Sequence, residues 1–222
     1  ITCTQQKHEL DIGLIGIYSG RYSEVGVSSR NGAALAIEQI NQKGGLLGRK
    51  VTFTPIDVKN DKNLTMRAFE QHIAAGRNFI IGPNISHLSE ETRMYAMKDN
   101  LLIISPTMST DKMLGLDDNF FRVISVTSQE GKKLAEIAKN KGLTRAAVIY
   151  DISNAEYTEP IYSSFRQEFE KNSSAKIVYV NHVSNDIDED FLDMAESITA
   201  TSADMVLILT TAIDAAYIAQ QI

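Results

Sequence analysis

The chain has 222 residues, of which 43% are hydrophobic and 7% aromatic, enough for one large apolar core or two modest ones. Its net charge of −6 argues against nucleic acid as a partner, because no basic stretch is present to displace counterions from a phosphate backbone. No run approaches the roughly 18 to 20 apolar residues that a transmembrane helix needs. We therefore expect a globular α/β protein.

Residues 1–9 form a polar lead-in that carries the single cysteine, Cys3, so no disulfide can form within the chain. No charged-then-apolar leader precedes the first strand, and we expect the chain to begin after any targeting segment. Two interpretations of Cys3 stay open. It is either an incidental residue of a tail or the lipid-bearing first cysteine of a processed bacterial lipoprotein, although Thr2 fits the second poorly.

The first half of the chain alternates short apolar strands with helices. The pattern predicts strands at 11–18, 50–57, 79–81 and 101–104, and helices at 28–43, at 61–75 and from Ser89, whose hydroxyl we expect at the helix start. The third and fourth strands are apolar throughout, which is typical of strands buried on both faces of a parallel sheet. The second strand has the alternation of a strand nearer the sheet edge.

A second cycle follows an extended apolar segment at 119–127. It comprises helices at 128–142, 159–171, 190–200 and from 212, and strands at 146–150, 176–180 and 205–209. For the helices we expect inward faces formed by Ala33, Ala34, Ile37 and Ile40, by Met94, Tyr95 and Met97, and by Leu134, Ile137 and Ala138.

The two cycles predict two doubly wound parallel-sheet lobes, joined near 120–123. The expected domains are a tether at 1–9, lobe one at 10–120 and lobe two at 121–222. Because the last helix has no cap, no stop signal and no following strand, we expect lobe two and the return to lobe one to be truncated.

Small hydroxyl-bearing loops follow the third and fourth strands. Ser86 comes after 79–81, and Thr107 and Ser109 come after 101–104. Right-handed crossovers bring the carboxyl ends of neighbouring parallel strands to one edge of the sheet, so these residues should converge there. Hydroxyls and backbone amides can hold a small carboxylate without a positive charge, which predicts ligand binding rather than turnover.

Three glycines, Gly13, Gly16 and Gly20, resemble a dinucleotide-binding loop only superficially. Their spacing is G-x-x-G-x-x-x-G, and Asp57 is the only suitably placed acid for a ribose. Close packing of a strand on a helix at Gly13 and Gly16, with a turn at Gly20, is the favoured interpretation.

Metal binding and nucleophilic catalysis find little support. The four histidines, at positions 8, 72, 87 and 182, never pair at metal-ligand spacing, and the acidic run at 186–190 lacks the EF-hand pattern. No G-x-S-x-G elbow is present, although His87 lies beside Ser86 and keeps an enzyme among the alternatives.

Four segments carry a resemblance to a known family. They are SGRYSEVGVSSRNGAALAIEQINQKGGLLGRKV, IIGPNISHLS, LIISPTMST and VIYDISNAEYTE. From Leu10 onward the chain resembles the periplasmic type I solute-binding proteins of the leucine/isoleucine/valine kind. The resemblance implies two doubly wound lobes joined by a three-segment hinge, with the ligand in the cleft between them and closure that signals to a membrane partner.

The same resemblance assigns roles to the hydroxyl residues. It implies that Ser86 donates to the α-carboxylate of an amino acid, that Ser109 contacts both ends of the ligand, and that Thr107 offers its backbone carbonyl to the ammonium group. The acid that pairs with this ammonium is expected beyond residue 222.

Aromatic positions follow in the same way. Tyr157 corresponds to an aromatic that closes over the ligand. The loop is longer here, so Ala155 and Asn154 stay open as alternatives for that place. Thr211 falls where another cleft aromatic sits, and Tyr18 and Tyr22 are expected to form the side-chain pocket.

Together these points predict an extracytoplasmic, periplasmic solute-binding protein that captures a small carboxylate, with a branched-chain amino acid as the first choice, for the membrane subunits of an ABC importer. No cofactor, nucleic acid or enzymatic activity is expected, and a lipid anchor through Cys3 stays open. The alternatives are a ligand-sensing ectodomain of a membrane receptor and a small-molecule α/β enzyme that uses Ser86 and His87.

Overall fold

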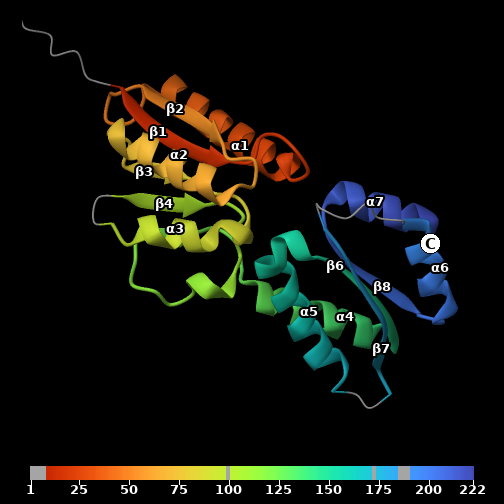
Figure 1. Ribbon diagram of the computed structural model, residues 1–222. Coiled ribbons are helices and arrows are strands. Elements are labelled where there is room, and N and C mark those ends of the chain that lie inside the picture. Colours follow the sequence, from red (N-terminus) through yellow and green to blue (C-terminus); the bar gives the residue numbers. More distant parts are fainter. Residues whose placement is uncertain (1–8, 99–100, 172–173, 185–190) are drawn as a thin grey trace, which may run out of the picture. The chain divides into compact units, whose positions relative to one another are not determined.

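The computed structural model describes residues 9–98, 101–171, 174–184 and 191–222. The chain divides into two compact units, whose elements are labelled in Figure 1. Unit 1 comprises Ile1–Met108 and Gly115–Ile124, and unit 2 comprises Ser109–Leu114 and Ser125–Ile222. Within the described ranges, every helix is too short or too polar to cross a membrane.

Unit 1 is built on a five-stranded parallel sheet with the order β2-β1-β3-β4-β5. Its strands are β1 (Leu10–Gly16), β2 (Val51–Asp57), β3 (Phe79–Ile81), β4 (Leu102–Ser105) and β5 (Phe120–Arg122). Its helices are α1 (Ser23–Gln42), α2 (Lys62–Ala74), the short 3₁₀ turn η1 (Ser86–Leu88) and α3 (Ser89–Ala96). The position of β2 at the edge of the sheet confirms the expectation from its alternating pattern.

Unit 2 holds a three-stranded parallel sheet with the order β7-β6-β8. Its strands are β6 (Arg145–Asp151), β7 (Lys176–Val183) and β8 (Met205–Leu209). Its helices are α4 (Thr127–Asn140), α5 (Ala155–Phe169), α6 (Phe191–Ala200) and α7 (Ala212–Gln221), with 3₁₀ turns η2 (Asp111–Met113) and η3 (Ile152–Asn154).

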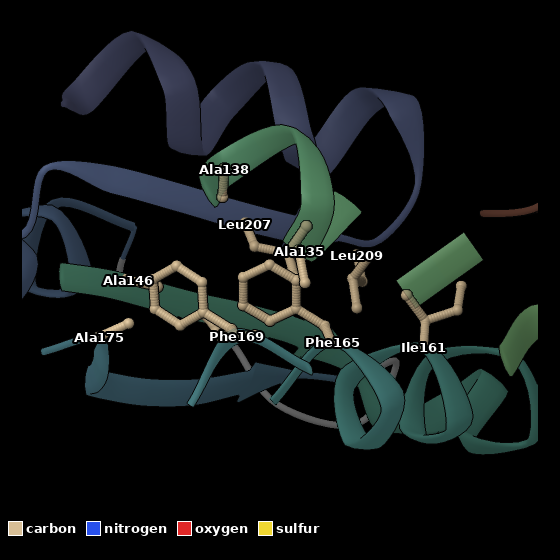
Figure 2. Packing of buried hydrophobic residues seen from close by; sticks show 10 residues of the cluster. Ala135, Ala138, Ala146, Ile161, Phe165, Phe169, Ala175, Leu207 and Leu209 are labelled. Carbon is tan, nitrogen blue, oxygen red and sulfur yellow. The ribbon is translucent and has the colours of Figure 1, made fainter. Parts of the chain in front are cut away.

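Two apolar clusters bury the two faces of the unit 2 sheet. On one face, α4 and α5 pack on β6 and β8, and the rings of Phe165 and Phe169 stack with their centroids 5.1 Å apart (Figure 2). On the other face, Met194, Ile198 and Ile218 from α6 and α7 pack against the central strand. Helices on both faces of a parallel sheet are the doubly wound arrangement that the sequence predicts.

The prediction of which helix residues face the core is wrong at several positions. Met94 and Met97 are 62% and 61% exposed, because α3 turns Tyr95 and Ala96 inward instead. Ile40 and Ile137 are also exposed, one at the border of the buried stripe of α1 and the other beside the buried Ala138 of α4.

Two local expectations about the strands and helix starts also need correction. Phe79 and Ile104 are exposed, so β3 and β4 are not buried on both faces in the described residues. Ser89 does not cap α3, because η1 runs directly into the helix and Leu88 occupies the N-cap position without a side-chain hydrogen bond.

The glycines of β1 allow the close packing that the sequence favours. A Cβ on Gly13 would lie 2.5 Å from Ile80 Cδ1 and 2.8 Å from Cγ of His72, a residue of α2. Gly20 has a φ of +81°, which suits the turn expected there. These observations confirm close strand–helix packing at Gly13 and a turn at Gly20.

The packing at Gly13 buries His72 completely, and this should make unit 1 sensitive to acid. Burial lowers the pKa of His72 below its ordinary value of 6.5. The backbone of Leu14 and the charge of Asp11 oppose this shift, and Arg77 adds to it. The unfolded chain then binds the proton first. The contribution to stability is therefore complete above about pH 6.5 and is lost as the pH falls towards the lowered pKa.

Urea unfolding at about pH 7.5 and about pH 5 tests this expectation. The midpoint should fall on acidification, and His72→Gln should reduce that fall, whereas His182→Gln at an exposed position should not. An equal pH dependence for the native protein and the His72 variant would contradict the assignment.

Candidate functional site

The loops that follow β3 and β4 are tied to each other by hydrogen bonds. Ser105 Oγ donates to the carbonyl of Pro83 over 2.6 Å and accepts from the amide of Met108 over 3.0 Å. Thr107 Oγ1 donates to the carbonyl of Asn84 over 2.5 Å. These bonds fix the carboxyl ends of two neighbouring parallel strands as one rigid edge, and they engage the Thr107 hydroxyl within the protein.

Two polar side chains are buried at this edge without a hydrogen-bond partner among the described residues. Ser86 is 2% exposed and its Oγ has no partner, and Asn84 is 3% exposed and its Oδ1 has none. Leaving a buried polar group unsatisfied costs about 1 to 3 kcal/mol, so such groups normally bind protein, water or ligand. Sequence reasoning selected Ser86 and missed Asn84, whose only signal is its place two residues after Gly82.

Ser109 belongs to unit 2 and shows the same feature. It is 0% exposed, and its Oγ has no partner within the described residues. Its carbonyl accepts a hydrogen bond from the amide of Thr127 at the start of α4, over 3.1 Å. The backbone of Ser109 is therefore anchored while its hydroxyl keeps its hydrogen-bonding capacity.

The loop after β1 is organised by Asp57 at the end of β2. Asp57 accepts from the amide of Tyr18 over 2.9 Å, from Ser19 Oγ over 2.6 Å and from the amide of Lys59 over 3.1 Å. Burial would raise the pKa of Asp57, but these hydrogen bonds outweigh it and lower the pKa. The carboxylate that a dinucleotide would require for its ribose is thus used to hold the loop.

The Tyr18 ring lies beside Gly16, since a Cβ there would be 2.8 Å from its Cε1. The guanidinium of Arg30 lies 5.2 Å from the ring centroid. Burial raises the pKa of Tyr18 from its ordinary value of 10.0 to about 12. Tyr22, the second aromatic expected to line a pocket for the ligand's side chain, is buried at the start of α1.

Tyr157 is directed towards α4 in the structure. Its ring packs against the cluster shown in Figure 2, and the Glu130 carboxylate of α4 lies close enough to act on its hydroxyl electrostatically. Burial, together with the Glu130 carboxylate, raises the pKa of Tyr157 to about 12. Burial also raises the pKa of Glu130. Ala155 and Asn154, the alternatives to Tyr157, lie where β6 leads into α5.

Thr211 caps α7 at its N-terminus. Its Oγ1 donates to Asp214 Oδ2 over 2.9 Å and accepts from the Asp214 amide over 3.2 Å. The hydroxyl is therefore already hydrogen-bonded within the helix start, and its expected contact with a ligand stays a prediction.

The described residues contain no group of three histidine, cysteine or acidic side chains that could hold a metal ion. His87 is part of η1 and is only partly buried. Cys3, His8 and the acidic residues at 186–190 lie outside the described residues.

Comparison with known proteins identifies the class of protein to which this chain belongs. The family described as periplasmic binding protein matches residues 9–222. The chain therefore belongs to the periplasmic binding protein family. The predicted resemblance to the type I proteins of the leucine/isoleucine/valine kind, and the α/β fold that it implies, are confirmed.

Among curated relatives, the Leu/Ile/Val-binding protein BraC3 of Rhizobium johnstonii is 25% identical over 201 residues, which cover 89% of this chain and 53% of that protein. Among solved structures, the branched-chain amino acid transporter substrate binding protein LivJ of Streptococcus pneumoniae, in complex with isoleucine, has a TM-score of 0.81 at 22% identity, covering 90% of this chain and 57% of LivJ.

A solute binding protein of an ABC transporter from R. palustris, in complex with benzoate, has a TM-score of 0.79 at 21% identity, covering 91% of this chain and 55% of that protein. At these identities the two solved structures show the fold alone. The chain spans about half the length of the curated relatives it matches.

Proposed function

We propose that this protein is an extracytoplasmic solute-binding protein that captures a small carboxylate for the membrane subunits of an ABC importer and catalyses no reaction. The observation that carries the proposal is the buried hydroxyl of Ser86 after β3, which has no hydrogen-bond partner in the part of the chain that the structure describes. A ligand carboxylate would accept a hydrogen bond from this hydroxyl and remove the cost of its burial.

Membership of the family supports this function. BraC3 is named for leucine, isoleucine and valine, LivJ holds isoleucine, and the R. palustris protein holds benzoate. A carboxylate is the chemical group that these ligands share. A branched-chain amino acid is accordingly the first candidate, and periplasmic transport is the process in which it would be used.

Ser109 supplies a second buried hydroxyl of the same kind in unit 2. As the family resemblance implies, this hydroxyl would also donate a hydrogen bond to the ligand. Binding would then favour the ligand-bound conformation, and a membrane partner could recognise that conformation.

A thermal-shift screen of the intact protein against the amino acids and a panel of small aromatic and aliphatic acids tests the proposed function. A ligand that binds only the folded state must raise the melting temperature. A shift with carboxylates and none with their amides would support the role of Ser86. The absence of a shift with every carboxylate would contradict the proposal.

Ser86→Ala and Ser109→Ala should each weaken binding of the identified ligand by about 1 to 3 kcal/mol, because each leaves a buried carboxylate oxygen with one hydrogen bond fewer. Isothermal titration calorimetry measures the change. Ser163→Ala, at an exposed position of α5, is the control and should leave the dissociation constant unchanged. Unchanged binding in both site variants would refute the assignment.

A further inference from the structure

We propose that Asn84, together with Tyr18, recognises a second, hydrogen-bonding group on the ligand, so that the preferred ligand is a small carboxylate with a hydroxyl or amide at its other end. This inference rests on the proposed function and refines it. It names a specificity residue that the family resemblance did not supply.

The first observation is the state of the Asn84 side chain. Asn84 is 3% exposed, yet its Oδ1 has no hydrogen-bond partner within the described residues. Its backbone is held in place, because its carbonyl accepts from Thr107 Oγ1 over 2.5 Å. A fixed backbone that holds a side-chain amide oxygen without a hydrogen-bond partner is the arrangement expected of a residue that binds a ligand.

The second observation is the place where this amide lies. A Cβ on Gly16 would be 2.5 Å from Asn84 Oδ1 and 2.9 Å from Cζ of Tyr18. The amide oxygen of Asn84 and the hydroxyl-bearing carbon of Tyr18 therefore both lie against Gly16 at the carboxyl end of β1. Only a glycine at this position leaves room for both side chains. β1 pairs with β3, so Tyr18, in the segment after β1, lies at the same sheet edge as Asn84 and Ser86, which both follow β3.

The chemistry of this pair indicates what it can recognise. The amide offers both an acceptor and donors, and the neutral phenol of Tyr18 can donate and accept a hydrogen bond. An aliphatic ligand end would leave Asn84 unsatisfied, whereas a hydroxyl or amide would complete its hydrogen bonds. A site built to bind a polar group discriminates strongly against the analogue that lacks it.

Pairs of ligands that differ in one polar group test the inference: threonine against valine, asparagine against leucine, and 4-hydroxybenzoate against benzoate. For the pair whose size suits the site, titration calorimetry of the intact protein should show that the polar ligand binds at least roughly tenfold more tightly than its apolar analogue. Asn84→Leu keeps the number and branching of the side-chain heavy atoms but removes the amide, and it should abolish or reverse this preference. Tyr18→Phe, which removes only the hydroxyl, should reduce it.

Ser86→Ala separates this inference from the proposed function, because it should weaken both members of a pair by a similar factor. If native protein binds both members equally and Asn84→Leu changes nothing, the role of Asn84 is overturned while carboxylate binding stands. If none of the six compounds binds, the proposed function and this inference fail together. Melting curves of both site variants establish that they fold.

Discussion

Replacing Gly26 by alanine should lower the free energy of unfolding of unit 1 by about 3 kcal/mol, whereas Gly32→Ala in the same helix should raise it by up to about 1 kcal/mol. Gly26 is buried in the first turns of α1, and a Cβ there would overlap the carbonyl of Ile17 and lie 2.9 Å from its amide nitrogen. A backbone neighbour cannot rotate away. Around Gly32 a Cβ would meet nothing within 4 Å, so alanine gains helix propensity without a clash.

Urea unfolding followed by circular dichroism measures both changes, with hydrogen exchange of the β1 amides reporting on unit 1 separately from unit 2. Because the two variants carry the same substitution in one helix, any general effect of alanine cancels in their difference. Shifts of equal sign and size would contradict the close approach of α1 to the end of β1.

The order of strands and helices could be predicted from the sequence because the apolar runs are short and clearly bounded. The strand expected at 205–209 coincides with β8, and the helix expected at 61–75 agrees with α2 to within one residue at each end. α2 begins where the sequence shows it, since Asp61 accepts a hydrogen bond from the amide of Leu64 and caps the helix.

Helix starts were missed where the chain has no capping side chain of its own. α1 begins at Ser23 rather than 28, and α5 at Ala155 rather than 159. Neither Tyr22 nor Asn154, their N-cap residues, makes a side-chain hydrogen bond to the helix. Tertiary packing, for example of Gly26 on Ile17, determines where α1 begins. Such packing cannot be predicted from the local sequence pattern.

Some residues of the candidate site could likewise be predicted from the sequence, and one could not. Ser86 and Ser109 could be selected because hydroxyls after buried strands, and the family resemblance, both point to them. Asn84 could not, since an asparagine shortly after Gly82 and Pro83 is an ordinary turn residue in a sequence. Only the fold shows that its amide is buried beside Tyr18 and that its Oδ1 has no hydrogen-bond partner among the described residues.

Asp111→Ala should destabilise unit 2 by about 3 kcal/mol, because it removes three charge-assisted hydrogen bonds from the start of α4. Asp111 Oδ2 accepts from Thr127 Oγ1 over 2.7 Å and from the amide of Ser128 over 3.1 Å, and Oδ1 accepts from Ser128 Oγ over 2.8 Å. Val126, the N-cap residue of α4, cannot supply a side-chain acceptor. A negative charge at a helix N-terminus also interacts favourably with the helix dipole.

Thermal unfolding and hydrogen exchange of the Thr127 and Ser128 amides test this role. Asp117→Ala removes the same charge from an exposed position and should change stability little. Asp111→Asn keeps one acceptor and should fall between the two. Loss of protection confined to α4 would show that Asp111 caps the helix from sixteen positions away in the sequence, and would explain why Ser109–Leu114 belongs to unit 2. Equal stability of Asp111→Ala and Asp117→Ala would contradict this role, and the placement of Ser109 next to α4 would then rest on the hydrogen bond from the Thr127 amide alone.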